Sequence, residues 1–169
     1  MYRRVLRISR LDGLSIVIVA VLGTLLSLAF GDLVGVLVGL LVTGAGAMEL
    51  RGHKALQRRD ADGMRWLVRS QLFLLTVILV YCVSRLGSFD SEGAMGNLTP
   101  DAAATLQEAG IDASEIAPLV HTMFLALYGS VALVTVLYQG GMALYYRRRI
   151  ARITAFLAAP PAVPNYSVF

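Results

Sequence analysis

The chain of 169 residues is 57% hydrophobic, has a mean hydropathy of +0.68 and carries a formal net charge of +4. This composition is too apolar for an ordinary soluble domain, and the excess of basic residues is better explained by a membrane surface than by nucleic acid. The only cysteine is Cys82, which excludes an intramolecular disulfide and so a thiol-oxidising membrane enzyme. We expect Cys82 to be a small apolar packing residue.

Four apolar segments approach or exceed the roughly 20 helical residues that cross a hydrocarbon core of about 30 Å. They predict an all-α, polytopic integral membrane protein with four transmembrane helices in an up-down bundle. The predicted parts are a basic amphipathic segment (1–11), transmembrane helix 1 (12–31), transmembrane helix 2 with a cytoplasmic extension (32–59), a cytoplasmic turn (60–64), transmembrane helix 3 (65–86), an acidic extracytoplasmic loop with short helices (87–117), transmembrane helix 4 (118–149), and a basic, then Pro-rich, cytoplasmic tail (150–169).

The charges indicate how the chain is threaded. Fourteen of the fifteen basic residues fall in three segments: before the first apolar run, between the second and third, and after the fourth. By the positive-inside rule these segments, and therefore both termini, face the cytoplasm. Arg outnumbers Lys fourteen to one, which is typical of high-GC bacterial genomes, so we expect a bacterial inner (plasma) membrane.

The N-terminal segment has two interpretations. Arg3, Arg7 and Arg10 recur at helical spacing, as in an amphipathic helix on the inner leaflet, where each Arg gains about 1 kcal/mol from anionic lipid. Alternatively, the segment is a frayed cationic tail that only sets topology. We expect Asp12 to cap the first transmembrane helix. The basic residues predicted to face lipid are Arg3, Arg7, Arg10, Arg58, Arg59, Arg147, Arg148 and Arg149.

Small residues follow one face of each of the first two predicted helices. Small faces let helix backbones approach closely in lipid. Because only a tight turn joins the two helices, we expect them to pack on each other; the alternative is a subunit interface through Gly35 and Gly39. The predicted packing residues are Ala20, Gly23, Ser27, Gly31, Gly35, Gly39, Thr43 and Gly46.

Glu49 is the only acidic residue along the membrane portion of the second predicted helix, and it lies near the inner end. An acidic residue at the bilayer centre would be a functional candidate, but this one is expected to form a structural ion pair. The candidate partners are Arg51, His53 and Arg69. Beyond the following turn, Asp62 is placed to cap the third helix.

The outer loop contains six acidic residues and no Lys or Arg. Such a ring of negative charge would concentrate cations at the outer mouth of a pore. We also expect one or two short helices here. The acidic residues are Asp90, Glu92, Asp101, Glu108, Asp112 and Glu115.

The fourth predicted helix has the most polar face. His121, Tyr128 and Thr135 recur every seven residues, and Gln139 follows one turn later. Such a stripe can bond to neighbouring helices, line an aqueous path or bind a polar head group. We expect interhelical bonding and retain these four residues as pore-lining candidates.

No catalytic, metal-binding or cofactor-binding pattern is present in the sequence. We therefore expect a non-enzymatic membrane protein, specifically a homo-oligomeric, cation-favouring channel. Alternatives are an accessory or structural subunit of a larger membrane complex, or a membrane enzyme or binder acting on lipid or quinone. The expected partners are anionic lipids of the inner leaflet and further copies or other membrane subunits. The Pro-rich tail would be a disordered end or a strap on a neighbouring subunit.

Overall fold

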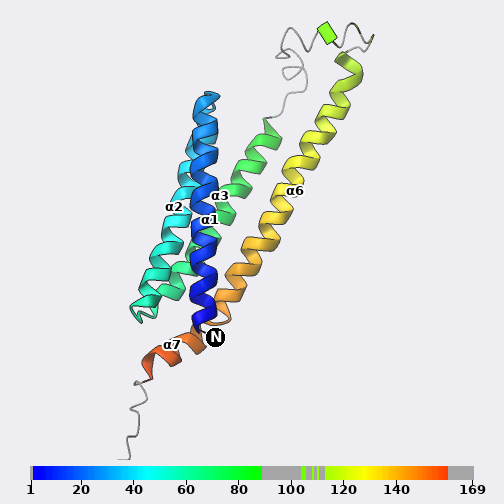
Figure 1. The fold of residues 1–169 in the computed structure, drawn as a ribbon. Coiled ribbons are helices and arrows are strands. Elements are labelled where there is room, and N and C mark those ends of the chain that lie inside the picture. The colour runs from blue at the N-terminus through cyan, green and yellow to red at the C-terminus, as the bar shows by residue number, and fades with distance from the viewer. Residues whose placement is uncertain (1, 89–103, 106–107, 109, 111–112, 160–169) are drawn as a thin grey trace, which may run out of the picture. The chain divides into compact units, whose positions relative to one another are not determined.

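A computed structural model describes residues 2–88, 104–105, 108, 110 and 113–159. In this part of the chain all regular structure is helical, with α1 (Tyr2–Ala29), α2 (Leu33–Gln57), α3 (Asp62–Gly87), α6 (Ala113–Arg147) and α7 (Ile150–Ala158) as its main elements (Figure 1). Four helical stretches are long and apolar enough to cross a membrane: α1, α2, α3 and the run Ile116–Ala158. The predicted all-α chain with four membrane-length helices is therefore confirmed.

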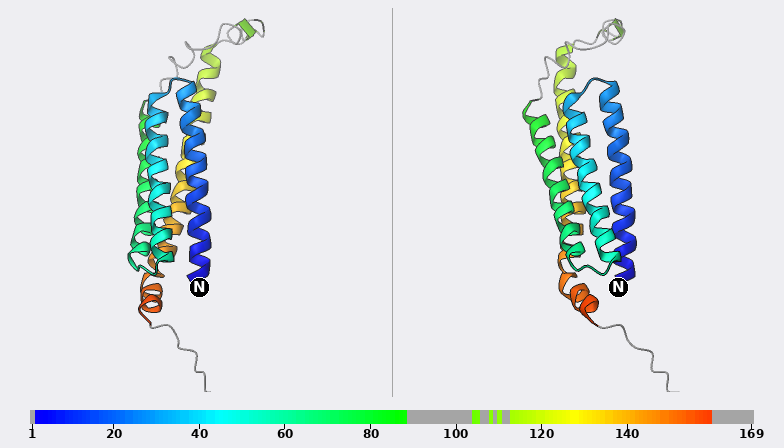
Figure 2. Two further views of the ribbon diagram at one scale, coloured as in Figure 1. Left: turned by 60° about the vertical axis from the view of Figure 1, so that its left-hand side comes forward. Right: turned by 90° about the vertical axis from the view of Figure 1, so that its left-hand side faces the viewer.

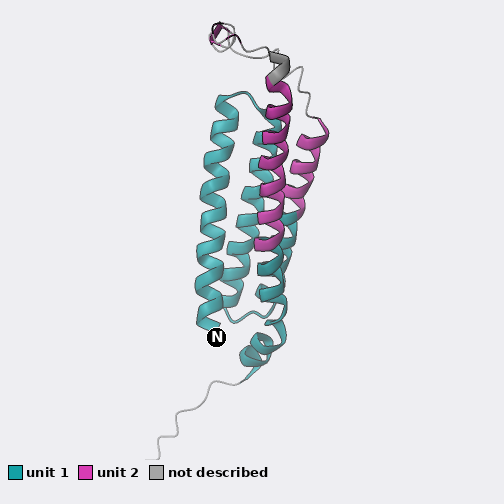
Figure 3. Cartoon of the chain, turned by 90° about the vertical axis from the view of Figure 1, so that its right-hand side faces the viewer, with its two compact units in different colours: residues 1–75, 139–169 teal, residues 76–138 magenta. Residues whose placement is uncertain are grey.

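The chain divides into two compact units (Figure 3). Unit 1 comprises residues 1–75 and 139–169, and unit 2 comprises residues 76–138. Helices α3 and α6 each contribute one part to unit 1 and another to unit 2. Unit 1 thus contains all of α1, α2 and α7, and it also contains the site described below.

Helix α1 is continuous through the boundary that the sequence predicted at residue 12. Asp12 is a buried residue in the middle of this helix, so it does not cap a helix start. The helix continues through residue 12 because its buried residues follow helical spacing on both sides of that position. One face of α1 therefore stays packed against neighbouring helices; its buried residues include Val5, Ser9, Asp12 and Ala20.

A tight turn joins α1 to α2, and the two helices run antiparallel and side by side (Figure 2). The Asp32 amide donates to the Ser27 carbonyl at 2.8 Å, and the Gly31 amide donates to the Leu28 carbonyl at 3.2 Å. Gly31 has a φ of +70°. These bonds and the left-handed glycine form a Schellman-type helix end, which allows the chain to reverse within a few residues.

Several of the small residues bring α1 and α2 into close contact. A Cβ atom on Gly39 would overlap Thr24, one on Gly35 would overlap Ser27, and one on Gly46 would lie 2.6 Å from Val17 Cγ2. The small face of α2 therefore packs on α1 within the chain, as in the first of the two interpretations.

Other residues of the predicted packing set have different surroundings. Ala20 is buried, and the Thr43 hydroxyl donates to the Gly39 carbonyl of its own helix at 2.8 Å. A Cβ atom on Gly23 or on Gly31 would meet nothing within 4 Å. Gly31 belongs to the turn, and Gly23 lies on an exposed part of α1.

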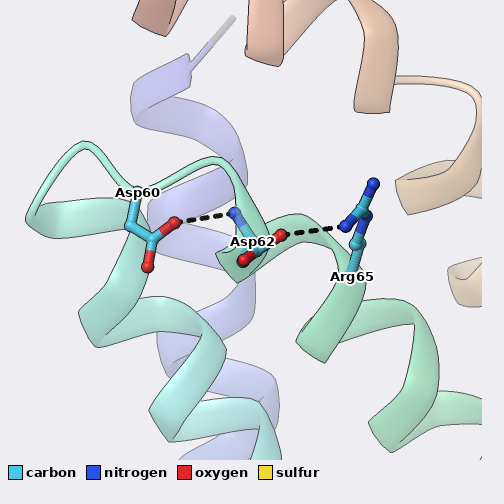
Figure 4. A network of polar contacts seen from close by, with 3 residues as sticks. All are labelled: Asp60, Asp62 and Arg65. Atoms are coloured by element: carbon cyan, nitrogen blue, oxygen red, sulfur yellow. Dashed lines mark hydrogen bonds and ion pairs between the residues drawn. The ribbon is translucent and has the colours of Figure 1, made fainter.

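The turn between α2 and α3 is stabilised by Asp60 (Figure 4). Asp60 Oδ1 accepts a hydrogen bond from the Asp62 amide at 2.9 Å, and Asp62 Oδ1 accepts one from Arg65 Nη1 at 3.1 Å. The predicted cap, Asp62, is instead the first residue of α3. The Asp62–Arg65 pair is largely exposed and contributes little to stability.

One end of unit 1 is closed by an apolar cluster. Helix α7, in the segment predicted to be a basic, then Pro-rich, tail (150–169), takes part in it through the buried Ile153. The Tyr2 ring lies 5.6 Å from that of Phe156, and the Tyr2 hydroxyl donates to the Leu56 carbonyl. The predicted Pro-rich segment lies outside the described residues. The cluster consists of Val5, Leu56, Met64, Leu67, Tyr146 and Ile153.

Replacing Gly39 with Ala should lower the free energy of unfolding by about 1–3 kcal/mol, because the new methyl group would be forced against Thr24. Gly44 is the matched control, since a Cβ atom there meets nothing within 4 Å. Gly44→Ala should be neutral or stabilising by up to about 1 kcal/mol through helix propensity. Equilibrium unfolding in mixed micelles tests the difference, and equal effects of the two substitutions would contradict the packing described.

Candidate functional site

Four helices of unit 1 each contribute one polar side chain to a buried layer. These are Asp12 of α1, Glu49 of α2, Gln71 of α3 and Tyr146 of α6. The first three lie seven residues along their helices from Val5, Leu56 and Met64, respectively, which belong to the apolar cluster at the end of the unit. Seven residues are two helical turns, or about 10 Å. The three polar residues therefore lie about that far along their helices from the end of unit 1 that the cluster closes.

The Gln71 amide joins the two carboxyl groups. Its Nε2 donates to Asp12 Oδ2 and to Glu49 Oε2, at 2.8 Å in each case. An amide nitrogen carries two hydrogens, so both are used, one for each carboxyl group. The Tyr146 hydroxyl donates to the second Glu49 oxygen, Oε1, at 3.1 Å. Helices α3 and α6 thus donate to Glu49, and Asp12 of α1 is joined to it through the Gln71 amide.

Two glycines bring α2 and α3 close enough for this contact. A Cβ atom on Gly63 would lie 2.7 Å from the Gly52 carbonyl oxygen, and both glycines are buried. The backbones of the two helices therefore approach within the reach of short side chains. The sequence analysis did not single out either glycine.

The polar layer is shielded from solvent. Glu49, Gln71 and Tyr146 have no exposed surface, and Asp12 is 6% exposed. Gln71 Oε1 is also buried, and it has no hydrogen-bond partner among the described residues. Burial of carboxylates is unfavourable unless opposite charge or several donors compensate.

The predicted ion pair of Glu49 is not formed. The neutral side chains of Gln71 and Tyr146 donate to it, and the Asp12 carboxyl group lies beside it. Arg51 instead lies over the Trp66 ring at 4.9 Å from its centroid, and Arg69 is exposed. The helical phase explains the difference, because Glu49 faces inward whereas Arg51, two residues later, faces outward.

The third candidate partner, His53, contacts α1. Its Nδ1 lies 3.1 Å from Ser9 Oγ, and Ser9 Oγ also donates to the Leu6 carbonyl at 3.2 Å. Ser9 is fully buried, and His53 is 7% exposed. This contact lies about one helical turn closer to the end of unit 1 than the carboxyl pair, and it holds the imidazole ring in place.

The polar stripe of the fourth predicted helix is only partly buried. Thr135 and Gln139 are buried, Tyr128 is half-buried and His121 is exposed. In unit 2, the Tyr128 ring lies 6.0 Å from Tyr81 and 4.5 Å from Phe124. In unit 1, Gln139 precedes Tyr146 by seven residues and so shares its face of α6.

Most of the predicted acidic residues of the outer loop lie outside the described residues, whereas the predicted basic residues are described and most are exposed. Asp90, Glu92, Asp101 and Asp112 lie outside the described residues, as does the side chain of Glu115, and Glu108 is exposed. Of the basic set, Arg149 is half-buried and stacks on the Tyr145 ring at 3.6 Å. The exposed members are Arg3, Arg7, Arg10, Arg58, Arg59, Arg147 and Arg148.

The arrangement of Asp12 and Glu49 is suited to binding a positive charge. Two ionised carboxylates that share one donor in a buried layer repel each other, and a proton or a small cation between them would relieve the repulsion. Among the described residues, no group of three or more His, Cys, Asp or Glu is placed to hold a metal ion. Comparisons with protein-family models, with characterised proteins and with solved structures find no match for this chain.

Gln71→Leu should lower the free energy of unfolding by at least about 2 kcal/mol, because both buried carboxyl groups lose their shared donor. Gln57→Leu is the matched control at an exposed position and should change stability by less than about 0.5 kcal/mol. Unfolding in mixed micelles measures both variants. A Gln71 variant as stable as the control would show that the amide does not hold the layer together.

Two adjacent tyrosines allow a second comparison. Tyr146→Phe removes the donor to Glu49 and should lower stability by about 1–3 kcal/mol, the cost of leaving a buried acceptor without its donor. The Tyr145 hydroxyl is buried and has no hydrogen-bond partner among the described residues, so Tyr145→Phe should be neutral or stabilising. The reverse order of stabilities would contradict the assigned contacts.

Proposed function

We propose that this chain is a non-enzymatic integral membrane protein that binds protons or small cations at the Asp12–Glu49 pair and conducts them across the membrane. One observation carries the proposal. Two carboxyl groups from different membrane-length helices share the Gln71 amide in a layer shielded from solvent. Ionisable residues at such positions commonly mark ion or proton pathways.

A purely structural role for the pair is less consistent with the surrounding charges. Fourteen basic residues lie in segments flanking the apolar runs, yet Glu49 is bonded to neutral groups. Arg51 and Arg149 contact aromatic rings instead. A buried carboxylate whose only function was packing would be better stabilised by one of these arginines than by an amide. The donors to Glu49 are neutral, so an exchangeable positive charge bound beside it would relieve the repulsion between the two carboxylates.

We further propose that both termini face the cytoplasm of a bacterial cell and that the protein lies in the inner membrane. The distribution of basic residues supports this orientation through the positive-inside rule. In that orientation the carboxyl pair lies near the cytoplasmic side, two helical turns from Val5 and Leu56 of the apolar cluster. The acidic loop would then face outward and attract cations toward the membrane.

The cation-favouring channel expected from the sequence is retained in a modified form. The carboxyl pair belongs to a single chain, so the binding step does not require a ring of copies. Association into an oligomer remains part of the proposal, because unit 1 exposes long apolar faces of α1 and α2 that several copies could share. The acidic residues of the outer loop would act by raising the local cation concentration.

Flux into proteoliposomes tests the proposal directly. Wild-type protein should carry protons, read with an internal pH dye, or Na⁺ or K⁺, read with ion-specific dyes. Asp12→Asn and Glu49→Gln should each lower the flux by about tenfold or more, since loss of one carboxylate weakens a bound cation by more than about 1.4 kcal/mol. Asp60→Asn is the matched control, because Asp60 is exposed and asparagine keeps the acceptor oxygen.

The contrary outcomes are distinct. Normal flux in both carboxyl variants, with a loss only when Asp101, Glu108 and Asp112 are neutralised together, would move the function to the outer loop. No flux from the wild-type chain, with an unrelated membrane protein purified alongside it, would favour the accessory subunit. Either result would overturn the role proposed for Asp12 and Glu49.

A further inference from the structure

A pocket of about 440 Å³ opens between α1 and α2 at the basic end of unit 1. Its polar lining comes from Arg7 and Arg10 of α1 and from His53 and Gln57 of α2. The apolar part of the lining includes Leu11 and Leu14. The carboxyl pair is not part of this pocket, which is therefore separate from the cation site proposed above.

The charge of the pocket favours an anion. Two arginines line it, and no acidic side chain is among its lining residues in the described part of the chain. Arginine presents a planar fork of donors that matches phosphate oxygens. Gln57, another lining residue, adds a neutral amide donor.

His53 gives the pocket one rigid wall. Its side chain is 7% exposed, and Ser9 Oγ lies 3.1 Å from Nδ1. The contact fixes the orientation of the ring, so that its exposed edge belongs to the pocket. A preorganised polar group loses little conformational entropy when a ligand binds.

An exposed apolar strip leads away from the pocket along α1. It begins with Leu11 and Leu14 in the pocket lining and continues with Ile18, Leu22 and Leu25, all exposed and spaced by three or four residues. This spacing keeps the five side chains on one side of the helix. The arginines thus lie toward the basic end and the apolar strip toward the membrane, which is the polarity of a phospholipid.

We propose that this pocket binds the head group of an anionic phospholipid, with its phosphate on Arg7 and Arg10 and one acyl chain along the apolar strip of α1. The site rests on the proposed insertion into a membrane but not on cation binding by Asp12 and Glu49. Lipid binding and flux can therefore fail separately.

Native mass spectrometry of the full-length protein in mild detergent tests the site with phosphatidylglycerol as the probe. The Arg7→Gln/Arg10→Gln double variant should bind the lipid roughly 30-fold more weakly, the range expected when two arginines leave an anionic head group. Arg147→Gln/Arg148→Gln is the matched control. It also removes two exposed charges, and neither residue lines this pocket. Its affinity should stay within about twofold of the wild type.

A second pair of variants guards against loss of folding. Gln57 is exposed at the last residue of α2, so substitutions there should be tolerated. Gln57→Glu should weaken phosphatidylglycerol binding, and Gln57→Lys should strengthen it, because only the sign of the added charge differs.

Three results would overturn the proposal. Equal weakening in the two double-arginine variants would indicate general attraction to the basic surface. Equally tight binding of phosphatidylcholine would show that negative head-group charge is not recognised. Full displacement of the lipid by inorganic phosphate would assign the pocket to a soluble anion.

Discussion

The arrangement of unit 1 depends on the two hydrogen bonds that the Gln71 side-chain amide donates. One nitrogen, on α3, donates to carboxyl groups of α1 and α2 at the same distance of 2.8 Å. In a layer that excludes water, each unsatisfied carboxyl group would be strongly unfavourable. The amide therefore fixes the rotation of three helices about their axes, and Tyr146 adds α6 to the same point through Glu49.

Apolar and polar groups are separated along the helices of unit 1. Val5, Leu56 and Met64 of the end cluster lie two turns along their helices from the polar layer. Tyr146 belongs to both, since it packs in the cluster and its hydroxyl donates to Glu49. Between them, Ser9 and His53 form a second polar contact that joins α1 and α2. The layer is buried, which raises the electrostatic importance of each of its hydrogen bonds.

The close approach of the helices depends on residues without bulk. Gly39 and Gly46 allow α2 to pack on α1, and Gly52 and Gly63 allow α3 to approach α2. Without these contacts, side chains as short as aspartate and glutamine could not meet across three helices. In a membrane, the exposed apolar side chains would contribute little to this specificity, since apolar side chains gain nothing by leaving lipid for each other. Backbone proximity and polar bonding are thus the main determinants of the bundle.

The sequence by itself determined the four membrane-length helices. The length of an apolar run can be counted along the chain and compared directly with the thickness of a bilayer, without knowledge of the tertiary structure. It also identified Gly35 and Gly39 as packing residues of the hairpin, since a tight turn leaves few other arrangements. The site was found only in part. Glu49 was noticed for its charge, but its expected partners were basic, and Asp12 was assigned to a helix cap. The helical phase of Asp12 with Val5, Ser9 and Ala20 was the available signal for its burial. Helix α7 was missed as well, although Ile150, Ile153 and Leu157 follow helical spacing.

Only the tertiary structure decided that Gln71 and Tyr146 meet Asp12 and Glu49. Their contacts join residues far apart in the chain, and the rotation of each helix depends on all its neighbours at once.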